Sequence, residues 1–169
     1  KITAWWPEGT AKFVCIDFLT DLEAGQTRKF ILDYGLSVPK YGSGKIRVAN
    51  TAKGIAVSTG TMNVSFSRGQ ALFSNVTIGG KRIVGGPVTG RGLVSENKPD
   101  SEPIEYKLNI ARGGVVESGP VQLTVYLGGS YGNKKSRSPL AHQQKYPRYV
   151  FHGFVRMYAG STRMDVTHS

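Results

Sequence analysis

Apolar and polar residues alternate through most of the chain, which is the pattern of β-strands that bury one face. The segments TMNVSFS (61–67) and VQLTVYL (121–127) alternate strictly, and YVFHGFVRMYAG (149–160) is a denser version. GKIRVAN (44–50) and KGIAVST (53–59) are shorter instances. The residues that we expect to face a core are Met62, Val64, Phe66, Val121, Leu123, Val125, Leu127, Tyr149, Phe151, Val155 and Met157. The pattern predicts an all-β protein with antiparallel sheets.

The chain opens with two such alternating segments, separated by the sequence Trp6-Pro7-Glu8-Gly9. Proline fixes φ at about −65° and glycine tolerates a positive φ, so residues 7–10 are predicted to form the tight turn of a hairpin. Because the first strand is already under way at residue 1, we expect the numbered chain to be a piece of a longer one.

Turn-forming residues divide the rest of the chain. They cluster in LSVPKYGSG (36–44), which predicts a boundary between a small strand group, residues 1–40, and an antiparallel β-sandwich, residues 41–169. Glycine pairs such as 79–80 and 113–114 predict further turns between strands.

The charge is strongly positive and unevenly placed. The chain has 22 Lys and Arg against 11 Asp and Glu, and no acidic residue occurs from Tyr34 to Ser95 or from Ser118 to Met164. Such a surface attracts polyanions, so nucleic acid, acidic polysaccharide and anionic cell-wall polymer all fit it. The simpler alternative is that the charge keeps the protein soluble. Nucleic acid is the least favoured partner, because no known nucleic-acid-binding module is recognisable.

The densest basic stretch is a long polar segment between two strong strands, residues 128–148, which we interpret as a loop. Loops of this length without secondary structure are often functional or mobile. Aromatic rings beside cations suit sugars or bases, so the segment is the candidate contact for a polyanion or carbohydrate. The candidate residues are Tyr131, Lys134, Lys135, Arg137, His142, Lys145, Tyr146 and Arg148. The alternative is a solvated connection with no partner.

No catalytic constellation is evident. Glu102 and Glu105 lie close together, but they belong to a proline-flanked acidic segment rather than to two sides of a cleft. His152, on the predicted strand 149–160, is the most site-like histidine, although histidines on strands are more often structural. Asn63 and Asn75 each begin an Asn-x-Ser/Thr triplet, which matters only in a secreted glycoprotein.

Several classes of protein and site are not expected. No run approaches 18 apolar residues, so no transmembrane helix is predicted. The single cysteine, Cys15, rules out an internal disulfide framework and a cysteine-based metal site, and we expect it to be a small buried residue. There is no His-x-x-x-His pair and no phosphate loop, so we predict no metal and no other cofactor.

The opening segment resembles a known family. WPEGTAKF (6–13) is similar to the Trp-Pro-Asp-Gly-Ser-x-Arg/Lys-Trp signature of the exo-rhamnogalacturonan lyase and YetA-like family, with conservative departures at Glu8, Thr10 and Phe13. Similar segments follow in the family's order. They are IDFLTDLEAGQTRKFILDYG (16–35), NTAKGIAVSTGTMNVSF (50–66), ESGPVQLTVYLGG (117–129) and RMYAGSTRMDVTHS (156–169).

The resemblance implies that residues 1–40 are the C-terminal part of a RIFT-type β-barrel and that residues 41–169 belong to a central β-sandwich. The family's catalytic groups lie mainly in an α/α toroid, and no position here matches one of them. We therefore expect a noncatalytic β-module of a secreted or cell-surface protein that acts on or binds acidic polysaccharide. The alternative is a structural or adhesive extracellular protein that assembles through the edges of its β-strands.

Overall fold

The computed structural model describes residues 2–35, 44–51, 54–67, 69, 71–94, 103–132 and 149–169. The described residues form twelve strands in three antiparallel sheets and no helix, which confirms the prediction of an all-β chain. They accordingly contain no helix that could cross a membrane. The chain separates into two compact units, residues 1–43 and residues 44–169.

The described part of the first unit, residues 2–35, contains one hairpin. β1 (Ile2–Trp5) pairs antiparallel with β2 (Ala11–Val14). The amide of Trp6 donates to the carbonyl of Thr10 at 2.8 Å, and the amide of Gly9 donates to the carbonyl of Trp6 at 2.9 Å. Gly9 has a φ of 85°, the left-handed conformation that glycine adopts without a steric penalty. The predicted hairpin turn is confirmed.

This first unit buries very little. Within residues 2–35, only Ala4 and Cys15 are even half-buried. The large apolar side chains that it exposes are Ile2, Trp5, Trp6, Phe13, Val14, Ile16, Phe18, Leu19, Leu22, Phe30, Ile31, Leu32 and Tyr34. The described part of this unit therefore has no hydrophobic core of its own, and the assignment of residues 1–40 to a barrel stays a prediction.

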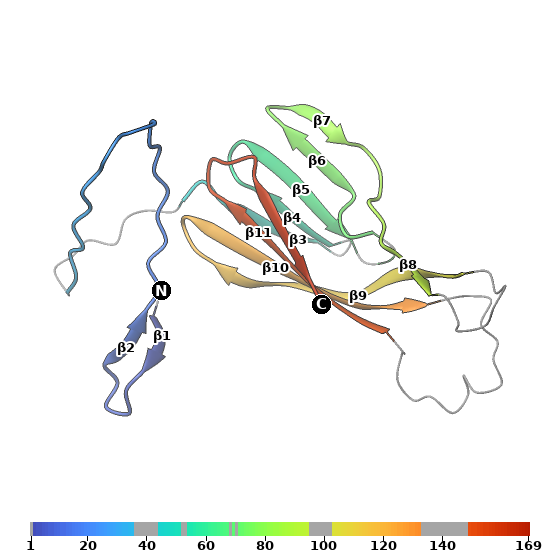
Figure 1. The fold of residues 1–169 in the computed structure, drawn as a ribbon, viewed down its shortest axis with the longest axis horizontal. Helices are drawn as coiled ribbons and strands as arrows, with labels where there is room; N and C mark the ends of the chain where they lie inside the picture. The colour runs from blue at the N-terminus through green and yellow to red at the C-terminus, as the bar shows by residue number, and fades with distance from the viewer. Residues whose placement is uncertain are drawn as a thin grey trace. The chain divides into compact units, whose positions relative to one another are not determined.

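The second unit consists of two five-stranded antiparallel sheets, which Figure 1 shows as two layers. One sheet has the order β3 (Arg47–Thr51), β4 (Gly54–Ser58), β5 (Met62–Ser67), β6 (Asn75–Ile78), β7 (Lys81–Val84). The other has the order β12 (Met164–His168), β11 (Tyr149–Tyr158), β10 (Gln122–Gly132), β9 (Ile104–Ser118), β8 (Arg91–Val94).

A single hydrophobic core lies between these two sheets, so the unit is a β-sandwich, as predicted. Nine residues expected to face the core are buried: Met62, Val64, Phe66, Leu123, Val125, Leu127, Phe151, Val155 and Met157. Two are not fully buried. Val121 is half-buried just before β10, and Tyr149, the first residue of β11, is 39% exposed.

The longest strand, β9, contains two irregularities that the sequence did not reveal. Its pairing with β10 shifts register between Thr124 and Val125 and again between Gly128 and Gly129. The expected turn at residues 113–114 is therefore wrong, because these glycines lie within β9, between the two bulges. The loop expected at 128–148 also begins later, since residues 128–132 belong to β10.

Candidate functional site

The outer face of the sheet that contains β8–β12 brings together one arginine, one histidine and two aromatic rings. The register places Gly128 of β10 opposite both Arg112 of β9 and His152 of β11. In the neighbouring row, Tyr126 of β10 lies opposite Phe154 of β11. We call Arg112, Tyr126, His152 and Phe154 the aromatic–basic cluster.

The strand period explains why these side chains point away from the core. Residues that alternate with them, such as Val125, Leu127, Phe151 and Val155, are at most 3% exposed and belong to the core. Successive side chains of a strand point to opposite faces, so the intervening residues must lie on the outer face. Phe154 is 42% exposed there.

Tyr126 is the centre of the cluster. Its hydroxyl is hydrogen-bonded to Nδ1 of His152 at 2.8 Å, and its ring centroid lies 5.9 Å from that of His152 and 5.4 Å from that of Phe154. When His152 carries its proton on Nε2, the Tyr126 hydroxyl donates this hydrogen bond; when Nδ1 is protonated, it accepts it. The second arrangement leaves the phenolic proton available for another acceptor.

Arg112 lies over the ring of Tyr126, with Cζ 5.9 Å from the ring centroid. Gly128 makes this approach possible. A Cβ atom at position 128 would lie 2.6 Å from the hydroxyl oxygen of Tyr126 and 2.7 Å from Nε of Arg112, closer than real Cβ contacts allow. The tyrosine hydroxyl and the guanidinium group therefore converge above a position that only glycine can occupy without displacing them.

The acidic residues near the cluster have other partners. Glu117 accepts hydrogen bonds from Gln122 and Thr124 at 3.1 and 3.3 Å. Asp165 accepts a hydrogen bond of 2.8 Å from Arg163 and one of 3.0 Å from Tyr158, and these bonds lower the pKa of Asp165. Within the described part of the chain, in contrast, Arg112 forms no ion pair. Its guanidinium group is thus available to an anionic ligand.

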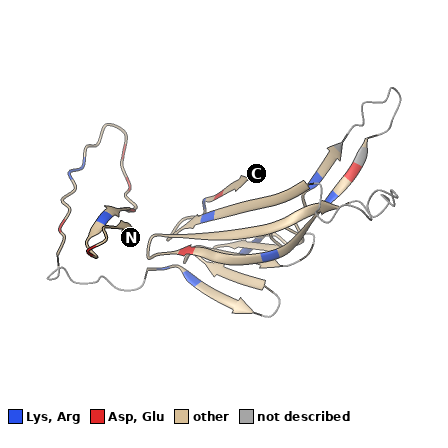
Figure 2. Ribbon diagram, turned by 90° about the horizontal axis from the view of Figure 1, so that it is seen from below, with Lys and Arg blue, Asp and Glu red and all other residues tan. Residues whose placement is uncertain are grey.

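The net charge of the protein belongs entirely to the second unit. Residues 1–43 hold five basic and five acidic residues, so the whole excess of 11 positive charges falls in residues 44–169. Figure 2 shows basic positions along the strands of this unit, with fewer acidic ones. The cluster therefore lies on the unit that attracts anions.

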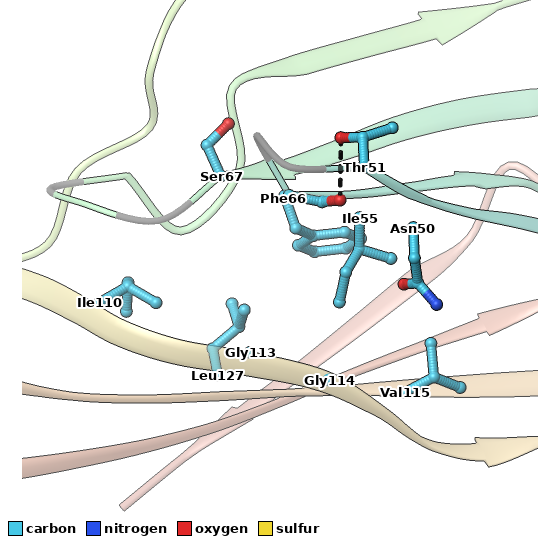
Figure 3. Close-up of a pocket in the computed structure, with 11 residues that line it drawn as sticks. Asn50, Thr51, Ile55, Phe66, Ser67, Ile110, Gly113, Gly114, Val115 and Leu127 are labelled. Carbon is cyan, nitrogen blue, oxygen red and sulfur yellow. Dashed lines mark hydrogen bonds between the residues drawn. The ribbon is translucent and has the colours of Figure 1, made fainter.

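A second feature is a pocket of about 400 Å³ between the two sheets. Figure 3 shows Asn50, Phe66 and Ser67 on one side of it and Leu127 on the other, with Gly113 of β9 close by. No titratable side chain is among its described lining residues. The pocket is large enough for a small ligand, but these residues offer it neither a charge nor a proton.

Of the predicted site residues, the structure describes Tyr131. It lies in β10 opposite Tyr149, is half-buried, and packs against the core, with its ring edge-on to Phe151 at 6.1 Å. The other candidates lie outside the described residues: Lys134, Lys135, Arg137, His142, Lys145, Tyr146 and Arg148. Their contact with a polyanion stays a prediction.

Other residues discussed from the sequence have clear positions. Glu105 lies in β9, not in a loop, and forms an exposed ion pair with Arg91 at 3.5 Å; Glu102 lies outside the described residues. Cys15 is half-buried rather than buried, and its Sγ donates to Asp17 at 3.5 Å. Asn63 is exposed in β5 and Asn75 is half-buried in β6. No group of residues able to hold a metal ion occurs within the described ranges.

His152 was singled out from the sequence, but its partners Arg112, Tyr126 and Phe154 were not. Their grouping depends on strand pairing, which a strand pattern does not specify. Chemically, the cluster offers one cation, two aromatic faces and a hydrogen-bonded pair that can donate or accept a proton.

No model of a known protein family matches this chain, and no curated protein matches it either.

Proposed function

We propose that this chain is a noncatalytic β-module of a secreted or cell-surface protein, and that it binds acidic polysaccharide. The observation that carries the proposal is the aromatic–basic cluster on the outer face of β9–β11. Exposed rings such as Phe154 pack against the apolar faces of sugars, and a guanidinium group such as that of Arg112 pairs with carboxylates.

Two further observations support a polyanionic ligand. The whole net charge resides in residues 44–169. In addition, the basic segment 133–148 connects β10 to β11, the two strands that carry Tyr126 and His152. This segment holds five of the cations of the second unit. The resemblance to rhamnogalacturonan lyases agrees with a uronate-containing polymer.

The noncatalytic part of the proposal rests on the position of the cluster. Tyr126, His152 and Arg112 lie on a sheet face, and none of them lines the pocket between the sheets. Enzymes that remove a proton next to a carboxylate enclose the reacting atoms and exclude water. An open sheet face suits binding along a polymer better than such chemistry.

The test is retention of the purified chain on immobilised polygalacturonate, with immobilised neutral galactan as the reference column. We expect retention on polygalacturonate alone, weakening as ionic strength rises because salt screens exposed charges. Phe154→Ala should elute earlier from the polygalacturonate column. Phe13→Ala, which removes an even more exposed ring from the first unit, should elute like the unchanged protein. Equal retention on both columns, or none on either, contradicts the proposal.

A further inference from the structure

We infer that Arg112, Tyr126 and His152 form a subsite for a single uronate carboxylate, so that the module recognises the free acid and not its ester. This inference rests on the proposed function and specifies which chemical group of the polysaccharide is recognised at the cluster.

The positions of the donors carry the inference. The hydroxyl oxygen of Tyr126 and Nε of Arg112 lie 2.6 and 2.7 Å from the position that a Cβ atom would take on Gly128, so the two groups lie close together on the outer face. A carboxylate that lies above both groups can accept a hydrogen bond from each. Arginine suits this role, because its planar guanidinium group pairs with carboxylates through charge-assisted hydrogen bonds.

His152 determines whether the tyrosine can take part. Its Nδ1 is 2.8 Å from the hydroxyl of Tyr126. When Nδ1 carries a proton it donates to the tyrosine oxygen, and the phenolic proton then points to the ligand. His152 thus acts on the carboxylate through Tyr126, which makes it a positioning residue.

The surroundings leave space for the sugar ring that carries the carboxylate. Gly114 lies opposite Tyr126 on β9, and a Cβ atom built there would meet nothing within 4 Å. On the other side of Tyr126 lies the exposed ring of Phe154, 5.4 Å away between centroids. A pyranose ring can therefore lie against Tyr126 while its carboxylate reaches Arg112.

The experiment measures equilibrium binding of the full chain to a galacturonate oligosaccharide and to its methyl ester. We expect the free acid to bind and the ester to bind much more weakly. Arg112→Gln should lower affinity for the free acid by about tenfold or more, the usual effect of losing a charge-assisted hydrogen bond, and should leave the weak ester binding unchanged. Arg82→Gln, which removes an exposed charge from β7 of the other sheet, is the matched control and should change affinity less than about threefold.

A glycine pair tests the geometry without changing the charge. Gly128→Ala places a methyl group where the Tyr126 hydroxyl and Arg112 converge, so it should weaken binding of the free acid as Arg112→Gln does. Gly132→Ala lies on the same strand, and its methyl group meets nothing within 4 Å. It should bind like the unchanged protein. Tyr126→Phe should weaken binding several-fold while keeping the ring. Thermal unfolding of each variant verifies that it is folded.

The outcomes separate this inference from the proposed function. If the unchanged protein binds polygalacturonate but Arg112→Gln and Arg82→Gln lose affinity equally, general electrostatic attraction explains binding and the carboxylate subsite is wrong. Equal binding of acid and ester also overturns it. If the unchanged protein binds neither polygalacturonate nor the oligosaccharide, the proposed function itself is wrong.

Discussion

Thr59 donates a hydrogen bond from Oγ1 to the carbonyl oxygen of Ser161, across 2.8 Å. The amide of Gly160 in turn donates to the carbonyl oxygen of Thr59 at 2.7 Å. These bonds join the turn between β4 and β5 to the turn between β11 and β12, and so connect the two sheets of the sandwich at one end. Thr59 is fully buried, and its hydroxyl also accepts from the amide of Met62 at 3.0 Å.

Replacing Thr59 with valine should therefore destabilise the sandwich. The substitution keeps the shape of the side chain but leaves the buried amide of Met62 and the half-buried carbonyl of Ser161 without this partner, a loss of about 1–3 kcal/mol in the free energy of unfolding. Denaturant titration gives the value. Thr61→Val is the control. Thr61 is exposed and its hydroxyl lies 3.4 Å from that of Thr59, so this substitution should change the free energy of unfolding by less than about 0.5 kcal/mol. Equal effects of the two substitutions would refute the role of the buried hydroxyl.

The two units should differ in their ability to fold alone. Residues 44–169 contain the hydrophobic core that the described residues form, so we expect a fragment of this length to unfold cooperatively with nearly the midpoint of the full chain. Residues 1–43 bury almost nothing in their described part, so a peptide of this length should show no cooperative transition in circular dichroism. A sharp thermal transition in that peptide would show that the first unit has a core of its own.

Asp165 should add a pH-dependent contribution to stability. Hydrogen bonds from Arg163 and Tyr158 lower the pKa of its carboxyl in the folded protein. The ionised form is thus preferred in the folded state. Its stabilising contribution is complete above the ordinary aspartate pKa of about 4 and is lost as pH falls through the lower folded pKa.

Thermal midpoints from neutral pH to strongly acidic pH measure this effect. The thermal midpoint of Asp165→Asn should be lower than that of the unchanged protein at neutral pH. The two midpoints should converge as pH falls below about 4. A difference that stays constant through the acidic range would show that the carboxyl contributes nothing through its charge.

The isolated chain should not cleave uronate polymers. Incubation with rhamnogalacturonan or polygalacturonate should produce neither the ultraviolet absorbance of unsaturated products nor new reducing ends. If turnover occurs and Tyr126→Phe or His152→Gln abolishes it, the cluster is an active site and the module is not merely a binding one.

Much of the fold could be predicted from the period of two. Met62, Val64 and Phe66 alternate with polar residues along β5, so they form one apolar face of the strand, and this face is the buried one. The hairpin could also be predicted from local sequence, because Pro7 restricts φ and Gly9 can adopt the positive φ that the turn requires.

The cluster could not be predicted because it depends on register between strands. The bulge at Val116 shifts β9 by one residue, which places Arg112 opposite Gly128 on the outer face. Without that extra residue, Gly113 and not Arg112 would lie opposite Gly128. The pattern of apolar and polar residues in β9 does not predict the bulge. The residues that lie next to Tyr126 can therefore be identified only from the structure.

The most direct test of the account is a nuclear magnetic resonance titration of the full chain with a galacturonate oligosaccharide, following the backbone amides. Binding at the aromatic–basic cluster predicts progressive shifts at Arg112, Tyr126, His152 and Phe154, together with their neighbours on β9–β11, and little change in β4 and β5. Shifts confined to the other sheet or to residues 2–35, or no shifts at saturating oligosaccharide, would contradict the account.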